Sequence, residues 1–176
     1  MDQELIGRAH ALLALCRDRQ LKIAVAESCT GGLLAATLTE VPGSSDVFDR
    51  GFVTYSDESK TAMLGVPIST LERDGAVSPA TAEAMSLGAL AQADADLAVS
   101  ITGIAGPSGA TLGKPVGLVH FAAAARDGRL LHHARNFGDI GRAQVRRASV
   151  VEALMMLHKL AAKDAPEPAP SSTLRS

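Results

Sequence analysis

The fold is decided by the stretch KIAVAESCTGGLLAATL, residues 22–38. Residues 22–26 form a short apolar run, which is typical of a strand buried in a parallel sheet. A polar turn follows at Glu27–Gly32, and residues 33–38 then predict a helix. A buried strand, a tight turn and a helix in this order form the repeating unit of α/β domains.

The rest of the chain alternates in the same way. Helices are expected at residues 3–19, 56–64, 79–93 and 142–163, and strands at residues 51–55, 97–101, 117–124 and 130–137. The last two strands would pair through a turn at Asp127-Gly128, so at least one strand is antiparallel. We therefore expect an α/β fold, a three-layer α/β/α domain with a mainly parallel mixed sheet of about five or six strands.

Three segments carry helix-capping signals. Ser56 is the expected cap of the helix at 56–64. The segment Ser69-Thr70-Leu71-Glu72 has the spacing of a capping box. Ser78 followed by Pro79 places a cap and a first-turn proline before an alanine-rich helix.

Length and composition indicate one globular domain. The chain has 176 residues, of which 47% are apolar and 20% charged. That length is enough for one domain with a real core, expected over residues 1–163. Residues 164–176 contain the run PEPAPSS, and a Pro/Ser-rich tail of this kind is expected to be disordered.

Charge and cysteine content argue against several classes of protein and of binding site. The net charge is −2, with 17 basic and 19 acidic residues, so we expect no nucleic-acid partner. Two cysteines are too few for a disulfide framework, and His132 and His133 would point to opposite faces of a strand, so no metal site is expected. The polar N-terminus and the lack of an apolar run of about 18 residues predict a cytoplasmic protein with no membrane segment.

Three polar or glycine-rich loops follow expected strands, at Glu27–Gly32, Tyr55–Lys60 and Thr102–Lys114. In an open α/β sheet, ligands bind beyond the carboxyl ends of the strands. The three loops should therefore meet around one site.

Ser28 is the candidate nucleophile, because it directly follows the first strand. The backbone N–H groups at the start of the next helix are unpaired, and they could hold a phosphate or the oxyanion of an attacked carbonyl. Glu27, Thr30, Gly31 and Gly32 would then lie against the substrate. On this loop alone, Ser28 or Thr30 could equally be a helix cap.

Lys60 is the candidate base. None of the five histidines falls in the three loops, which disfavours a Ser-His-Asp arrangement. Lys60 would need its pKa lowered from about 10.4 toward about 7–8 by burial or a nearby positive charge. Tyr55 could orient Lys60 or relay a proton. A solvated helix lysine and a core tyrosine remain the plainer alternatives for these two residues.

The loop Thr102–Lys114 and the last helix supply further candidates. Glycine lets backbone approach a ligand closely, so the glycine-rich segment with Gly103, Ala105 and Gly106 is a candidate for substrate contacts. Thr102, at the end of a strand, is a further candidate, and an ordinary strand-end threonine is the alternative. Arg142 and Arg146 are four residues apart on one helix face, which suits a phosphate. A solvated basic face is the alternative for the arginines.

Together these segments resemble the C-terminal domain of CinA proteins and the stand-alone nicotinamide-nucleotide amidases. The resemblance covers about residues 5–160. It rests on segments 26–32, 42–45, 50–56 with Lys60, 75–78, 102–107, 114–117 and the pair Arg142 and Arg146. The sequence departs from the family before the last helix, where Asp139-Ile140-Gly141-Arg142, counted with the preceding Gly138, holds two more residues than the usual Gly-Asp-Arg.

The resemblance implies hydrolysis of nicotinamide mononucleotide to nicotinate mononucleotide and ammonia, in pyridine-nucleotide recycling. It implies Ser28 as nucleophile, Lys60 as base and Tyr55 as an assisting group, with no cofactor. Members of the family are commonly oligomeric, so a homo-oligomer, with a dimer favoured, is expected. The alternatives are a non-catalytic nucleotide-binding or regulatory module and a partner-binding domain associated with DNA uptake or repair.

Overall fold

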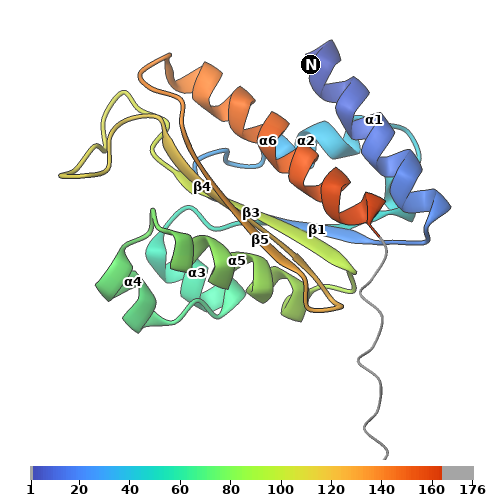
Figure 1. Ribbon diagram of the computed structural model, residues 1–176, viewed down its shortest axis with the longest axis horizontal. Coiled ribbons are helices and arrows are strands. Elements are labelled where there is room, and N and C mark those ends of the chain that lie inside the picture. Colours follow the sequence, from blue (N-terminus) through green and yellow to red (C-terminus); the bar gives the residue numbers. More distant parts are fainter. Residues whose placement is uncertain (1, 164–176) are drawn as a thin grey trace, which may run out of the picture.

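The structure is a computed structural model, and the residues it describes are 2–163. Five strands form one sheet in the order β2-β1-β3-β4-β5 (Figure 1). Their bounds are β1 Ile23–Glu27, β2 Phe48–Val53, β3 Leu97–Gly103, β4 Leu118–Ala125 and β5 Leu130–Asn136. The helices are α1 Gln3–Asp18, α2 Leu33–Thr39, α3 Asp57–Leu64, α4 Ile68–Asp74, α5 Pro79–Gln92 and α6 Arg142–Ala162, with a short 3-10 turn η1 at Ser44–Asp46.

The sheet is mixed. Strand β1 pairs in parallel with both β2 and β3, whereas β4 is antiparallel to β3 and to β5. Four of the five strands therefore run in one direction, and β4 opposes them. Helices α1, α2 and α6 cover one face, and α3, α4 and α5 cover the other (Figure 1). The expected three-layer α/β/α fold is confirmed.

Each face of the sheet has its own apolar core. The core under α1, α2 and α6 contains large side chains such as Leu12, Phe121 and Met156. The core under α5 is built largely from alanines of the sheet and of α5. Small side chains let α5 lie close to the sheet, and α3 then packs on α5.

Two details of the secondary structure differ from expectation. The strand expected at residues 51–55 spans Phe48–Val53, because it pairs with all of β1 from Ile23 onward. The expected capping box at Ser69 is wrong. Helix α4 already begins at Ile68 after Pro67, whose ring sets the extended backbone of the cap position.

The other capping predictions are confirmed. Ser56 caps α3 in a reciprocal capping box with Ser59, and Ser78 caps α5 with Pro79 in its first turn. Within residues 2–163, no helix is both long and apolar enough to cross a membrane. The tail expected at residues 164–176 lies outside the described residues.

The contact between α3 and α5 depends on a glycine. A Cβ added at Gly88 of α5 would lie 2.0 Å from the carbonyl oxygen of Leu64 of α3. Gly88→Ala should therefore destabilise the fold by about 1–3 kcal/mol, because neither backbone can move freely. Urea denaturation measures this change.

Gly7 of α1 is the matched control, because nothing lies within 4 Å of a Cβ added there. Gly7→Ala should stabilise the protein by about 0.5–1 kcal/mol through helix propensity alone. Equal effects of the two substitutions would contradict the close approach of α3 to α5.

Candidate functional site

The turn after β1 is organised by the carboxylate of Glu27. One oxygen accepts the N–H groups of Gly32 and Leu34 at 3.1 and 3.0 Å, and the other accepts that of Ala35 at 2.8 Å. These groups would otherwise be the free donors at the start of α2. A negative charge at a helix N-terminus is also favoured by the helix dipole. The side chain of Glu27 thus acts as an internal anion for α2.

The contacts of Glu27 revise two expectations: that Glu27 touches the substrate, and that the N–H groups at the start of the helix are unpaired. Glu27 is fully buried and its oxygens bind the helix, so the geometry gives it a supporting role for the turn instead of a substrate contact. The N–H of Ser28 donates to Ile101 at 2.9 Å and that of Gly31 to Ser28 at 3.0 Å. Among the backbone hydrogen bonds of residues 2–163, the N–H groups of Cys29 and Thr30 have no carbonyl partner. Of these two residues, Cys29 lines the cavity next to Ser28, so its N–H is the donor of this turn that is placed for a ligand.

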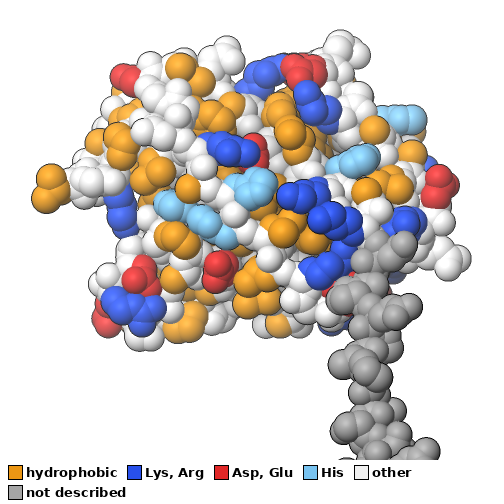
Figure 2. Space-filling view, in the orientation of Figure 1, with side chains coloured by type: hydrophobic (Ala, Val, Ile, Leu, Met, Phe, Trp, Pro, Cys, Tyr) orange, Lys and Arg blue, Asp and Glu red, His pale blue; other side chains and the backbone are white. Residues whose placement is uncertain are grey.

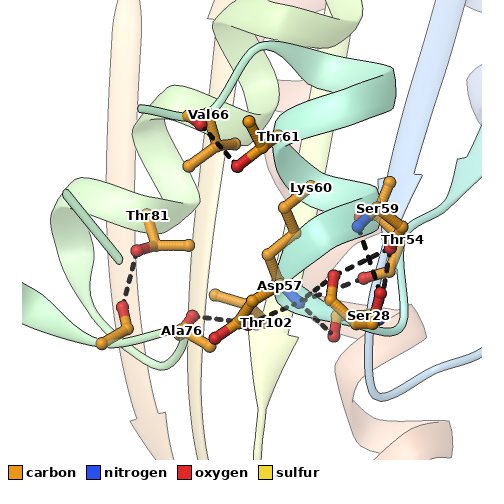
Figure 3. A network of polar contacts seen from close by, with 12 residues as sticks. Ser28, Thr54, Asp57, Ser59, Lys60, Thr61, Val66, Ala76, Thr81 and Thr102 are labelled. Atoms are coloured by element: carbon orange, nitrogen blue, oxygen red, sulfur yellow. Dashed lines mark hydrogen bonds and ion pairs between the residues drawn. The ribbon is translucent and has the colours of Figure 1, made fainter. Parts of the chain in front are cut away.

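Lys60 reaches from α3 to Ser28 (Figure 3). Its Nζ lies 3.3 Å from the Oγ of Ser28, and only 1% of the residue is exposed. The amine also donates to the backbone carbonyl of Thr54 at 3.1 Å. A second carbonyl, of Ser56, lies at 3.5 Å. The buried amine is therefore held by backbone on one side and faces the serine hydroxyl on the other.

Burial lowers the pKa of Lys60, because the ammonium loses its hydration in the protein interior. The carboxylate of Asp57, 3.7 Å from Nζ, acts in the opposite direction and raises this pKa. The net pKa lies below that of an ordinary lysine. A neutral amine next to a hydroxyl is the arrangement required of a general base. The solvated helix lysine is excluded by this burial.

Cys29 is the neighbouring thiol. Burial raises its pKa to about 12. The nucleophilic form of cysteine is the thiolate, which is scarce at neutral pH when the pKa is this high. Cys29 is therefore a poor rival to Ser28.

The three loops meet around a cavity of about 270 Å³, close to the lower end of the range known for small-molecule sites. Predicted site residues that line it are Ser28, Tyr55, Lys60, Thr102, Gly103, Ala105, Gly106 and Arg142. Thr30, Gly31 and Gly32 belong to the turn but do not line the cavity. The side chain of Thr102 is engaged elsewhere, since its hydroxyl donates to the carbonyl of Ala76 at 2.7 Å.

Tyr55 and Arg142 form the outer part of the site. Tyr55 is 58% exposed, so it is not a core tyrosine. Its hydroxyl oxygen accepts a hydrogen bond from Nη2 of Arg142 at 2.7 Å, and Nη1 of Arg142 donates to the carbonyl of Gly106 at 3.0 Å. Tyr55 is thus placed to orient Arg142, although the sequence suggested that it would orient Lys60. Arg146, one turn further on α6, donates to the carbonyl of Thr30 at 2.8 Å and supports the Ser28 turn.

Other basic side chains serve the fold. They gather with histidines over the β4–β5 hairpin (Figure 2). Arg126 donates to the carbonyls of Leu90, Ala93 and Ala95, and Arg135 forms a two-point contact with Glu152 of α6. No group of three or more His, Cys, Asp or Glu side chains that could hold a metal ion occurs between residues 2 and 163.

The sequence of this chain matches a known protein family. The model of the CinA C-terminal domain matches residues 7–161. The chain belongs to the CinA family. Among solved structures, a competence/damage inducible protein CihA from Agrobacterium tumefaciens is 48% identical, with a TM-score of 0.90 over 93% of this chain and 98% of that chain.

Curated CinA relatives are of two lengths. A CinA-like protein of Synechococcus is 49% identical over 85% of this chain but only 36% of its own length. The chain thus spans about a third of the longer relatives. A protein of Enterobacter agglomerans named nicotinamide-nucleotide amidohydrolase PncC is 54% identical over 65% of this chain and 70% of its own length.

Sequence reasoning missed two contributors to this CinA-family site, Thr54 and Asp57, and it assigned Arg146 to a phosphate instead of to the Ser28 turn. The carbonyl of Thr54 and the carboxylate of Asp57 both reach Lys60, and Arg146 supports the turn. Asp57 and Arg146 each have a local signal. Asp57 is three residues from Lys60 on one helix, and Arg146 is four residues from Arg142. A carbonyl contact such as that of Thr54 has no signature in side-chain identity.

The role of Glu27 is open to a direct test. Glu27→Gln replaces the anion by an amide whose NH₂ faces backbone donors, so the free energy of unfolding should fall by about 2–3 kcal/mol. Thermal and urea denaturation measure the loss.

Glu40→Gln, the same substitution at the other end of α2, is the control. Glu40 is exposed at the C-cap, where a carboxylate is not favoured by the helix dipole. Its removal should leave stability unchanged or slightly higher. An unchanged stability in Glu27→Gln would show that the Glu27 contacts do not hold the turn.

Proposed function

We propose that this chain is an amidohydrolase that converts nicotinamide mononucleotide to nicotinate mononucleotide and ammonia. The observation that carries the proposal is the buried contact of 3.3 Å between Lys60 Nζ and Ser28 Oγ. The name of the Enterobacter agglomerans relative, at 54% identity, supports the substrate class. The cytoplasmic location and the homo-oligomer expected from the sequence remain predictions.

The reaction uses the two residues in turn. Neutral Lys60 takes the proton of the Ser28 hydroxyl, and Ser28 Oγ forms a bond to the carboxamide carbon. The tetrahedral intermediate collapses, the C–N bond breaks, and Lys60 returns the proton to the departing amine, which leaves as ammonia. Lys60 then takes a proton from water, and the resulting hydroxide attacks the ester. The ester bond breaks, nicotinate mononucleotide leaves, and Ser28 regains its proton.

The oxyanion of each intermediate needs hydrogen-bond donors. In the Ser28 turn, the N–H group of Cys29 has no carbonyl partner, and Cys29 lines the cavity. Ala105 and Gly106, from the loop after β3, also line the cavity. We assign the oxyanion to these two segments, and each donor of this kind contributes about 10²–10³-fold to the rate.

The phosphate is assigned to the Arg142 end of the cavity. Arginine binds phosphate through paired N–H groups, and Tyr55 and Gly106 fix the guanidinium from both sides. The carboxamide would then lie at Ser28, in the inner part of the cavity, and the phosphate at its exposed rim.

Ammonia release from nicotinamide mononucleotide tests the reaction. Ser28→Ala and Lys60→Met should each reduce kcat by at least about 10³-fold, because each removes a group that the chemical step requires. Circular dichroism and melting temperature confirm that each variant is folded.

Cys29→Ala is the control for the nucleophile and should keep activity within about threefold of wild type, since the Cys29 thiol is protonated. Ser28→Ala with near-wild-type ammonia release would refute the assignment. Tight nucleotide binding without turnover in the wild-type protein would favour the non-catalytic module instead.

Arg142 can be tested through its expected partner. Arg142→Ala should raise KM for the mononucleotide by about 10- to 100-fold and leave kinetics with nicotinamide riboside, which lacks the phosphate, nearly unchanged. Arg147→Ala is the control, because Arg147 pairs with Asp2 and Glu4 at the N-terminus. Equal losses on the two substrates would contradict the phosphate assignment.

A further inference from the structure

We propose that Asp57 is a positioning residue for the reaction. It is the counter-ion that retains a proton on Lys60 in the free protein, and it thereby sets the pH above which Lys60 can act as a base. The proposal rests on the proposed function for its kinetic consequence, whereas the ion pair itself can be tested without turnover.

Asp57 lies on α3, the same helix that carries Lys60. Asp57 is the first residue of this helix and Lys60 lies three residues later, so both side chains are on one face. The carboxylate is 3.7 Å from Nζ, and Figure 3 shows Asp57 beside the amine end of the Lys60 side chain. The side chain of Asp57 is 56% exposed, whereas that of Lys60 is 2% exposed. The pair therefore joins a buried cation to a carboxylate at the cavity wall.

The hydrogen bonds of Lys60 suit either protonation state. A neutral amine has two N–H groups for the carbonyls of Thr54 and Ser56, and its lone pair can accept the proton of Ser28. An ammonium has a third N–H, which would point at Ser28 Oγ and block this transfer. The backbone contacts therefore do not decide between the neutral amine and the ammonium, and the nearby charges do.

Asp57 is the nearest of these charges. Among the described residues that line the cavity, it is the one carboxylate, and the cations are Lys60 and Arg142. On α3, Glu58 contributes a weaker effect of the same sign. From the Ser28 turn, the Cys29 thiol is protonated, and Tyr55 lies with Arg142 at the rim. The charge that most favours the ammonium is therefore on Asp57.

Asp57→Asn gives the test, because it keeps the size and the helix position while it removes the charge. The ε-carbon resonance of Lys60 in ¹³C-lysine-labelled protein reports the pKa of this amine directly. The chain has only five lysines. The Lys60 signal is identified by its absence from Lys60→Met or, should that variant not fold, by its persistence when the other four lysines are arginine.

Loss of the carboxylate should lower the pKa of Lys60 by roughly one pH unit, since an opposite charge within about 4–6 Å favours the charged form. The acidic limb of kcat/KM for ammonia release reports the free enzyme and should move to lower pH by the same amount. On that limb, Asp57→Asn should be up to about tenfold more active than wild type. The plateau at high pH should fall slightly, because the base is weaker.

Glu58→Gln is the matched control, as it removes the same charge from the same helix turn. It should shift both measurements by much less than Asp57→Asn. An unchanged Lys60 pKa in Asp57→Asn, or an equal shift in Glu58→Gln, would overturn the proposal. So would a shifted pKa with an unmoved kinetic limb. If the pKa falls but the wild-type protein releases no ammonia, the ion pair is upheld and the proposed function fails.

Discussion

The site depends on one physical constraint, the exclusion of the Lys60 amine from water next to Ser28. A lysine in water is protonated at neutral pH and cannot accept a proton. Burial penalises the ammonium, and two backbone carbonyls hold the amine against the serine hydroxyl. Serine is itself a weak nucleophile without such a base. In the proposed reaction, each residue acquires its reactivity from the other.

The surrounding fold can be understood as support for this contact. Helix α3 carries Lys60, its start is fixed by the Ser56–Ser59 capping box, and its end packs against Gly88 of α5. Next to β1, the carboxylate of Glu27 accepts the N–H groups at the start of α2 and so fixes the turn that carries Ser28. A carboxylate supplied by the chain occupies the helix terminus that, in many α/β proteins, binds the ligand's phosphate. The phosphate of the proposed substrate is accordingly assigned to Arg142 at the rim of the cavity.

Much of the fold could be predicted from local patterns. The buried strand before Ser28, the Ser56 cap and the hairpin at Asp127-Gly128 all have short-range signals that tertiary contacts do not override. The start of α4 was misplaced because the fixed backbone of Pro67 outweighs the weaker capping-box spacing at Ser69. In the candidate site, Ser28 was predicted from its place after the first strand and Lys60 from the lack of a suitable histidine, and the family resemblance pointed to both. The burial of Lys60 and the role of Glu27 could not be predicted, because both depend on helix packing rather than on neighbouring residues.

The central claim is that Ser28 and Lys60 act as one unit. A double-mutant cycle on kcat/KM for nicotinamide mononucleotide tests it most directly, with Ser28→Ala, Lys60→Met and the combined variant. If the two residues serve a single proton transfer, the combined variant should be no more than about threefold slower than the slower single variant. Multiplicative losses would show that the two residues contribute independently, and would contradict the account.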